Sequence, residues 1–329
     1  MSSPLEQLKG VKENEPLAPY TTFKIGGPAK YFFIAKTSDD IVKAVEMAKK
    51  LKMPYFILGG GSNLLVSDQG FDGLVIKILD SRFKISDLRV EVAAGALLST
   101  VVGKSVEAGL TGLEWAAGIY GTIGGAVRGN AGAFGHEMSE VVESVRIMNQ
   151  ELPARNASAS VAGGRIKNLK NKECGFGYRD SIFKQDKNLI ILEVVLKLGK
   201  GDKEKGKQEV KNILQARRER QPLEFPSAGS VFKNVEIANL SELKTNLRES
   251  LPEEFIAKGK IPAAWLIEEV NLKGKKIGGA EVSDKHANFI VNTGQATASN
   301  VLALISLIKM KVRDDLGIQL EEEIELVGF

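Results

Sequence analysis

The spacing of apolar and polar positions along the chain predicts strands that alternate with helices. Apolar residues recur at helical spacing in residues 38–51, and again in residues 98–108, where Gly109 follows as a C-cap. Short apolar or alternating runs predict strands at 55–58, 64–66, 74–78, 88–94, 141–148 and 189–196. Further helices are predicted at 199–221, 263–270 and 299–316. This mixture predicts a protein built from both helices and strands.

Three stretches fit the alternation less simply. Residues 1–19 are polar and contain prolines, so we expect a short helix and a lead-in there, followed by two extended pieces around a turn at 26–28. Residues 149–172 are polar, and we expect them to be mobile. Residues 318–327 alternate like a strand, with Leu320, Ile324 and Leu326 on one face and Glu321, Glu323 and Glu325 on the other. Such a row of carboxylates is typical of a solvated strand face.

Glycine is concentrated in two places. Residues 59–63 read Gly-Gly-Gly-Ser-Asn directly after a predicted strand, and residues 118–135 contain seven glycines. A strand that runs into glycines can present backbone amides to a phosphate. The alternative for each stretch is a glycine-rich turn between buried elements. No Rossmann fingerprint or P-loop is present, but two such stretches in one domain favour a dinucleotide bound in an extended pose.

Composition narrows the class of protein. A chain of 329 residues suggests about two domains of roughly 150 residues each. The net charge of +4 indicates no nucleic-acid surface. With Cys174 as the single cysteine there is no intrachain disulfide, which fits the cytoplasm. The start is unlike a signal peptide, no stretch of about 18 apolar residues predicts a membrane span, and the two histidines lack metal-ligand spacing.

The two glycine stretches together resemble the UDP-N-acetylenolpyruvoylglucosamine reductase (MurB) family. The matching motifs are residues 59–66, 118–127 and 129–135, with a similar opening motif at 22–29, and the resemblance extends over nearly the whole chain. It implies a two-lobed FAD-binding domain of the vanillyl-alcohol-oxidase/PCMH type, followed by a smaller α+β substrate-binding domain. We expect the first at 1–212, with lobes at about 1–75 and 76–212, and the second at 213–329.

The resemblance also assigns roles to residues that have simpler interpretations on their own. Arg179, in a Tyr-Arg-Asp-Ser motif, otherwise forms a structural pair with Asp180, whereas the family places this arginine against flavin and substrate. Ser230 is otherwise a local hydrogen-bonding serine without triad partners, whereas in the family it is the proton donor. Glu323 matches the family's catalytic glutamate. The resemblance therefore implies these three residues as the catalytic set.

Two further sets are implied in the same way. The predicted contacts to non-covalent FAD are Gly59, Gly60, Gly61, Ser62, Asn63, Gly118, Gly121, Thr122, Gly125, Asn130 and Gly132. The predicted substrate contacts are Tyr178, Lys233, Asn234, Lys275 and His286. The basic end of the predicted helix, residues 217–220, complements the helix dipole, and a role near a phosphate is the alternative. Departures from the family pattern are Tyr120, Arg128, Val235 and Glu322.

The implied activity is a two-step reduction. NADPH, as co-substrate, reduces FAD, which then reduces the enolpyruvyl group of UDP-N-acetylglucosamine enolpyruvate to give UDP-N-acetylmuramate for peptidoglycan. We expect a cytoplasmic monomer that needs no metal and neither binds nucleic acid nor inserts into a membrane. Two other classes stay open: an FAD oxidase that acts on an alcohol and tethers its flavin, for which His136 is the available residue, and a nucleotide-binding module without catalysis.

Overall fold

The computed structural model describes residue 5 and residues 8–150, 166–237 and 245–329. Its contacts group into two compact units. The first unit comprises Met1–Glu15, Ala29–Gly60 and Asp72–Arg217, and the second comprises Pro16–Pro28, Gly61–Phe71 and Arg218–Phe329. Two short segments from the first quarter of the chain thus pack with the C-terminal part. The expected functional division at residues 212 and 213 stays a prediction.

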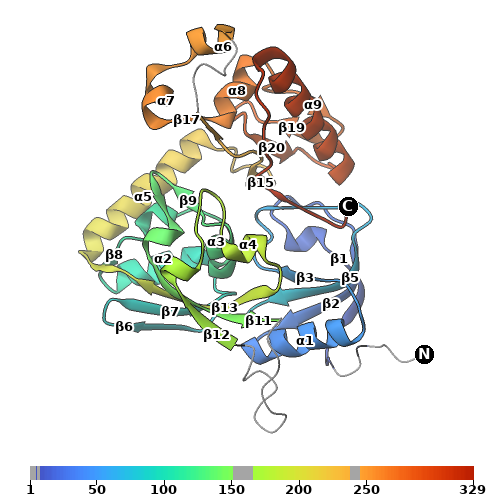
Figure 1. The fold of residues 1–329 in the computed structure, drawn as a ribbon, viewed down its shortest axis with the longest axis vertical. Helices are drawn as coiled ribbons and strands as arrows, with labels where there is room; N and C mark the ends of the chain where they lie inside the picture. Colours follow the sequence, from blue (N-terminus) through green and yellow to red (C-terminus); the bar gives the residue numbers. More distant parts are fainter. Residues whose placement is uncertain (1–4, 6–7, 151–165, 238–244) are drawn as a thin grey trace. The chain divides into compact units, whose positions relative to one another are not determined.

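The first unit contains a four-stranded sheet covered by a helix. The strand order is β1 (Lys12–Pro16), β2 (Pro28–Ala35), β5 (Phe71–Ile78) and β3 (Tyr55–Leu58), and β3 runs parallel to β5. Helix α1 (Ser38–Lys50) lies against this sheet (Figure 1). Its apolar stripe, which includes Ile41 and Val45, is buried against the strands, and Thr37 and Asp40 form a capping box at its start. This helix is where the periodicity predicts it.

A five-stranded sheet forms the rest of the first unit. Its order is β12 (Ile166–Lys170), β11 (Val142–Asn149), β13 (Leu189–Lys197), β7 (Arg89–Ala93) and β6 (Phe83–Ser86), and every neighbouring pair is antiparallel. Helices α2 (Leu98–Glu107), α3 (Ile123–Arg128), α4 (Ile182–Gln185) and α5 (Lys203–Arg220) accompany it. Strand β13 is apolar on both sides because Val194 packs into the core with α2 and α3, whereas Leu192 packs into the core with α1.

The second unit has its own core between a small sheet and helices. Strands β15 (Ser227–Ser230), β20 (Phe289–Asn292), β19 (Ala280–Val282) and β18 (Lys276–Ile277) form the sheet in that order. Helices α8 (Ala263–Glu269) and α9 (Ala298–Leu316) pack on it through buried leucines and isoleucines (Figure 1). Helix α9 begins with a capping box at Thr297 and ends at Gly317, whose φ of 78° is the left-handed angle of a C-cap.

The remaining elements are short. In the first unit they are η2 (Glu114–Ala116), η3 (Met138–Glu140), η4 (Asn171–Glu173), β8 (Leu110–Thr111), β9 (Gly132–Ala133), β10 (His136–Glu137) and β14 (Gly199–Lys200). In the second they are η1 (Ala18–Tyr20), β4 (Leu64–Val66), β16 (Val235–Glu236), α6 (Thr245–Ser250), α7 (Glu253–Lys258), β17 (Lys260–Ile261) and β21 (Glu325–Val327). Strand β21 pairs in parallel with β4. The described part of the chain has no helix that is both long and apolar enough to cross a membrane.

Several sequence-based expectations need correction. The short helix expected in the first 19 residues is replaced by β1 and the 3₁₀ turn η1, although residues 1–4 and 6–7 lie outside the described residues. Within the polar stretch 149–172, β12 and η4 are ordered elements, and residues 151–165 lie outside the described part. In the C-terminal stretch only residues 325–327 are a strand, and Leu326 is 43% exposed while Val327 is buried. The uniform alternation therefore breaks after Ile324.

Candidate functional site

The two glycine stretches touch each other in the first unit. Gly60, just after β3, packs so closely that a Cβ on it would lie 2.5 Å from Cα of Gly121. A Cβ on Gly59 would lie 2.7 Å from Oγ1 of Thr122. Since real Cβ atoms do not approach backbone this closely, glycine is required here for one backbone to pass the other. The stretches that the sequence singles out separately thus form one structure.

The second glycine stretch begins with a turn and continues into helix α3 (Ile123–Arg128), which the sequence analysis did not predict. Thr122, which is buried, caps α3 by accepting a hydrogen bond from the amide of Gly125 at 3.4 Å. The amide of Ile123 donates to the carbonyl of Ala96 at 2.8 Å, and Gly124 similarly donates to Ala94. The first amides of α3 thus join the helix to the turn between β7 and α2. The predicted FAD contacts of Thr122 and Gly125 stay predictions.

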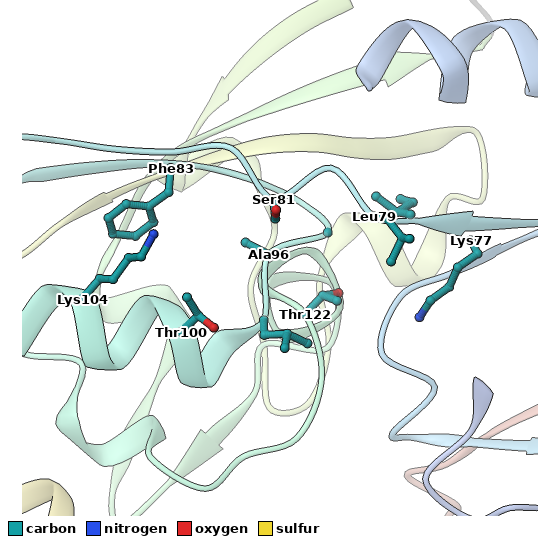
Figure 2. A pocket seen from close by; sticks show the side chains of 11 residues that line it. Lys77, Leu79, Ser81, Phe83, Ala96, Thr100, Lys104 and Thr122 are labelled. Atoms are coloured by element: carbon teal, nitrogen blue, oxygen red, sulfur yellow. The ribbon is translucent and has the colours of Figure 1, made fainter. Parts of the chain in front are cut away.

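A cavity lies beside these glycines, and sequence reasoning missed it. It has a volume of about 350 Å³ and is lined by residues from β5, β6 and α2 together with Thr122 (Figure 2). Lys77 lines it and donates to the carbonyl of Gly59, and burial lowers the pKa of this lysine from its ordinary value. At the other end, the amino group of Lys104 lies 4.9 Å from the ring centre of Phe83. The available signal was a lysine within the apolar run 74–78.

Three predicted residues of the first unit form a second cluster. Arg179 lies at the tip of a tight turn in which Gly177 and Asp180 exchange backbone hydrogen bonds, and its own φ is 54°. Its Nη2 donates to the carbonyl of Gly132 at 2.6 Å. The side chain of Asn130, which is fully buried, donates to the carbonyl of Gly177 at 2.9 Å. The end of the glycine stretch therefore holds the turn that carries Arg179.

Other side chains of this cluster support the same turn. The guanidinium of Arg179 lies 5.3 Å from the ring centre of Tyr178. Asp180 accepts hydrogen bonds from the amide of Ser181 at 2.9 Å and from the side chain of Gln185 at 2.8 Å. The hydroxyl of Ser181 donates to the carbonyl of Arg128 at 2.6 Å. The four-residue motif is thus fixed mainly by backbone contacts.

Arg217 is another buried residue next to the glycine stretch. Its Nε donates to the carbonyl of Ala117 at 2.7 Å, and its guanidinium lies 5.2 Å from the ring centre of Phe134. Burial lowers the pKa of the guanidinium. A Cβ on Gly118, whose φ is 78°, would lie 2.7 Å from Cδ of Arg217. The arginine therefore packs directly on the turn that opens residues 118–135.

In the second unit the structure brings Ser230 and Glu323 onto neighbouring segments. Ser230 ends β15, and the next residues pair with the C-terminal stretch through an isolated bridge between Phe232 and Glu322. The amide of Glu323 donates to the carbonyl of Val231 at 2.7 Å. Both Ser230 and Glu323 are half-buried. The pairing thus joins the predicted proton donor to the predicted catalytic carboxylate.

The residues around Ser230 are held by side-chain bonds to backbone. The amide side chain of Asn288 accepts from the amide of Phe232 at 2.9 Å and donates to its carbonyl at 2.8 Å. His286 lies close by: its Nδ1 accepts from the amide of Asn288 at 3.3 Å, and its ring packs edge-on against Phe289. Burial lowers the pKa of His286. These contacts give His286 a positioning role beside its predicted substrate contact.

The other residues predicted in the second unit also have structural contacts. Lys233 pairs with Glu321 at 3.2 Å, and Oδ1 of Asn234 accepts from the amide of Ala263 at the start of α8. Lys275 is exposed. Among the remaining predicted FAD contacts, Gly61, Ser62 and Asn63 belong to this unit. The side chain of Asn63 donates to the carbonyl of Glu323 at 3.0 Å, so it helps to position the C-terminal stretch.

Two family models match separate parts of the chain. Residues 29–151 match a model described as an FAD binding domain, and residues 221–327 match the model of the C-terminal domain of UDP-N-acetylenolpyruvoylglucosamine reductase. Within the described residues, no three His, Cys, Asp or Glu side chains are grouped as metal ligands.

Whole-chain relatives extend the likeness beyond single domains. A UDP-N-acetylenolpyruvoylglucosamine reductase from Solibacter usitatus is 38% identical over 318 residues, which cover 97% of each chain. One from Caldanaerobacter subterraneus is 40% identical over 96% of this chain and 93% of its own. The crystal structure of such a reductase from Thermus caldophilus is 34% identical, covers 96% of this chain and 98% of its own, and superimposes with a TM-score of 0.71.

Proposed function

The chain belongs to the UDP-N-acetylenolpyruvoylglucosamine reductase family, and on that premise we propose that Arg179, Ser230 and Glu323 carry out the chemistry of its reaction. The protein is an FAD-dependent oxidoreductase that uses NADPH to reduce the enolpyruvyl group of UDP-N-acetylglucosamine enolpyruvate, in peptidoglycan precursor synthesis. The proposal concerns which side chains act and how.

The residues of the first unit fit an extended dinucleotide. Gly60 and Gly121 pack backbone against backbone, and this contact fixes the course of both glycine stretches, on which the proposed FAD contacts lie. The other proposed FAD contacts are Gly118, Thr122, Gly125, Asn130, Gly132, Gly59, Gly61, Ser62 and Asn63. When bound, FAD supplies hydride transfer between NADPH and the enolpyruvyl C3.

The protein must then stabilise charge on the substrate. Hydride addition at C3 leaves negative charge at C2, next to the substrate carboxylate, and this charge needs a hydrogen-bond donor or cation close by. Arg179 supplies a permanent cation, and its bond to the carbonyl of Gly132 fixes the guanidinium. Glu323 is the second residue proposed to stabilise this charge.

Ser230 completes the reaction by donating a proton to C2. A serine hydroxyl is a weak acid, so it is useful only against a strongly basic carbon that is held within hydrogen-bond distance. The observation that carries this proposal is the hydrogen bond at 2.7 Å between the amide of Glu323 and the carbonyl of Val231, which joins the segment of the carboxylate to that of the serine. It supports joint action on one substrate.

The proposal also covers the substrate contacts, the domain boundaries, the oligomeric state and the location in the cell. Lys275 is proposed to contact the diphosphate of the substrate, and the other proposed substrate contacts are Tyr178, Lys233, Asn234 and His286. We place functional domains at 1–212 and 213–329, and we propose that the protein acts as a monomer in the cytoplasm.

An anaerobic absorbance experiment tests the function. The purified protein should be yellow, NADPH should bleach it, and the UDP-enolpyruvyl sugar should restore the colour. Flavin should be released when the protein is denatured, as expected for non-covalent binding. Yellow protein that NADPH bleaches but the enolpyruvyl sugar does not reoxidise would contradict the assigned substrate.

A further inference from the structure

Arg217 carries a buried charge that the described residues leave uncompensated. Its side chain, near the end of α5, is only 8% exposed. Nη2 is buried and has no hydrogen-bond partner, and no carboxylate among the described residues pairs with the guanidinium. Because an unpaired buried charge is costly, a residue of this kind needs a functional explanation.

Neither helix capping nor core packing gives that explanation. A basic residue in the last turn of a helix can complement the helix dipole, but Arg218 and Arg220 are exposed there and serve that purpose in solvent. Arg217 instead donates Nε to the carbonyl of Ala117, outside its own helix. An apolar side chain would fill the same space without a desolvated charge.

The surroundings fix the guanidinium and leave its buried Nη2 for a ligand. On one side it packs against Gly118, where a Cβ would lie 3.2 Å from Nε and 2.7 Å from Cδ. On another side the guanidinium lies 5.2 Å from the ring centre of Phe134. Both contacts belong to the glycine stretch 118–135. The side chain is thus preorganised, and Nη2 is a buried donor without a hydrogen-bond partner among the described residues.

We propose that Nη2 of Arg217 binds a diphosphate oxygen of FAD, which rests on the proposed function and decides between the helix-dipole and phosphate roles that the sequence leaves open for residues 217–220. The charge of the arginine is permanent, so its counter-charge must be present in the resting holoenzyme. The diphosphate meets this condition, whereas oxidised flavin is neutral and the substrate comes and goes. An arginine with two or more donors suits a phosphate oxygen.

The test compares Arg217→Met with Arg218→Met, which removes the same charge from an exposed neighbour on the same helix. FAD affinity is measured from the fluorescence of free flavin, and FAD-dependent stabilisation from the rise in melting temperature on adding FAD. We expect Arg217→Met to bind FAD roughly ten- to a hundredfold more weakly and to lose most of that rise. Arg218→Met should match the wild type in both.

Binding of two fragments of FAD shows whether Arg217 contacts the diphosphate or the flavin ring. ADP carries the diphosphate, and riboflavin carries the ring without phosphate. We expect Arg217→Met to weaken ADP binding to the flavin-free protein and to leave riboflavin binding unchanged, and Arg217→Lys to retain part of the ADP affinity. Arg217→Lys also guards against a misfolded methionine variant. Weaker riboflavin binding with unchanged ADP binding would overturn the proposal, as would equal losses in the two methionine variants.

The outcomes also separate this inference from the proposed function. If the wild-type protein completes the NADPH and enolpyruvyl-sugar cycle while Arg217→Met binds ADP normally, only the assignment of Arg217 is wrong. If the wild-type protein binds ADP through Arg217 but cannot reduce the sugar, the function is wrong and the anion site stands.

Discussion

Left-handed backbone angles mark the residues that surround the predicted flavin site of the first unit. Asn130, Phe134 and Arg179 have φ of 42°, 54° and 54°, which non-glycine residues rarely adopt. Strain of this kind persists only where the surroundings enforce it. Asn130 and Arg179 are each fixed by a hydrogen bond to a backbone carbonyl. No sequence pattern predicts these angles, because the partners come from separate parts of the chain.

Ser230→Ala separates the two halves of the reaction. A proton donor to C2 acts only after NADPH has been consumed, so the rate of the NADPH half-reaction should be close to normal. The enolpyruvyl half-reaction should slow roughly 10²–10⁴-fold, as is typical of general-acid loss. Substrate binding should change little, because a hydroxyl that acts in the transition state adds little to ground-state affinity. Anaerobic stopped-flow absorbance measures each half.

Two controls make this result interpretable. Ser227→Ala removes another hydroxyl from the same strand and should leave both half-reactions near the wild-type rate. Equal slowing of both halves in Ser230→Ala would indicate a disturbed loop, and a normal second half would remove Ser230 from the mechanism.

At the scale of elements, the contact between the two glycine stretches gives Gly60 its importance. Gly60→Val should abolish FAD binding, because its side chain would push Gly121 away, where a Cβ alone would already lie 2.5 Å from Cα. Gly103→Ala is the matched control, since Gly103 is exposed in α2 with no atom within 4 Å of its added Cβ. That change should stabilise the protein by about 0.5–1 kcal/mol. Full flavin occupancy in Gly60→Val would contradict the role given to this contact.

The C-terminal stretch allows a comparison among three glutamates. Glu323→Gln should slow the enolpyruvyl half-reaction by roughly 10²-fold or more, because the change removes the carboxyl group that is proposed to stabilise the charge at C2. Glu321→Gln breaks only the exposed pair with Lys233 and should cost less than about 1 kcal/mol of stability. Glu325→Gln should turn over near normally. Identical rates in all three variants would show that the carboxylates form a solvated face.

The positions of helices and strands were easier to predict from the sequence than the elements against which they pack. Helices α1, α2 and α9 lie where apolar periodicity and caps place them, because both signals are local. Helix α3 could not be predicted from the sequence, because a glycine-rich run is a poor helix former. Its packing with residues of β7 and β13 in one core stabilises the helix. The C-terminal alternation suggested a continuous strand, but its pairing partners change from the Ser230 segment to β4.

At the scale of the whole molecule, the family motifs predicted the catalytic residues Arg179, Ser230 and Glu323. Which segments of the chain lie next to one another could be learned only from the structure. The sequence could not indicate that Asn63 bonds to the carbonyl of Glu323, or that Pro16–Pro28 and Gly61–Phe71 pack with the C-terminal part. These contacts join segments far apart in the chain, and no local pattern encodes them. Arg217 shows the same limit, because its burial depends on Ala117 and Phe134 and not on its helix.

The stability of the whole protein should depend on pH through His286. Its pKa is lowered in the fold, mainly by burial, so the folded state binds fewer protons than the unfolded state near the ordinary pKa of about 6.5. Stability is therefore fully present above that value and falls as the pH drops through and below it. Of the two charges that act on the ring, Glu268 raises the pKa and Lys273 lowers it, and burial outweighs both.

His286→Asn removes this titration while offering Oδ1 where Nδ1 accepts from the amide of Asn288. Urea unfolding between about pH 8 and pH 5 should show a smaller loss of unfolding free energy in His286→Asn than in the wild type. His136→Asn, at the exposed second histidine, is the control and should follow the wild-type curve. If His286→Asn followed that curve as well, the acid sensitivity would belong to other groups, and His286 would hold Asn288 without being kept neutral by its burial.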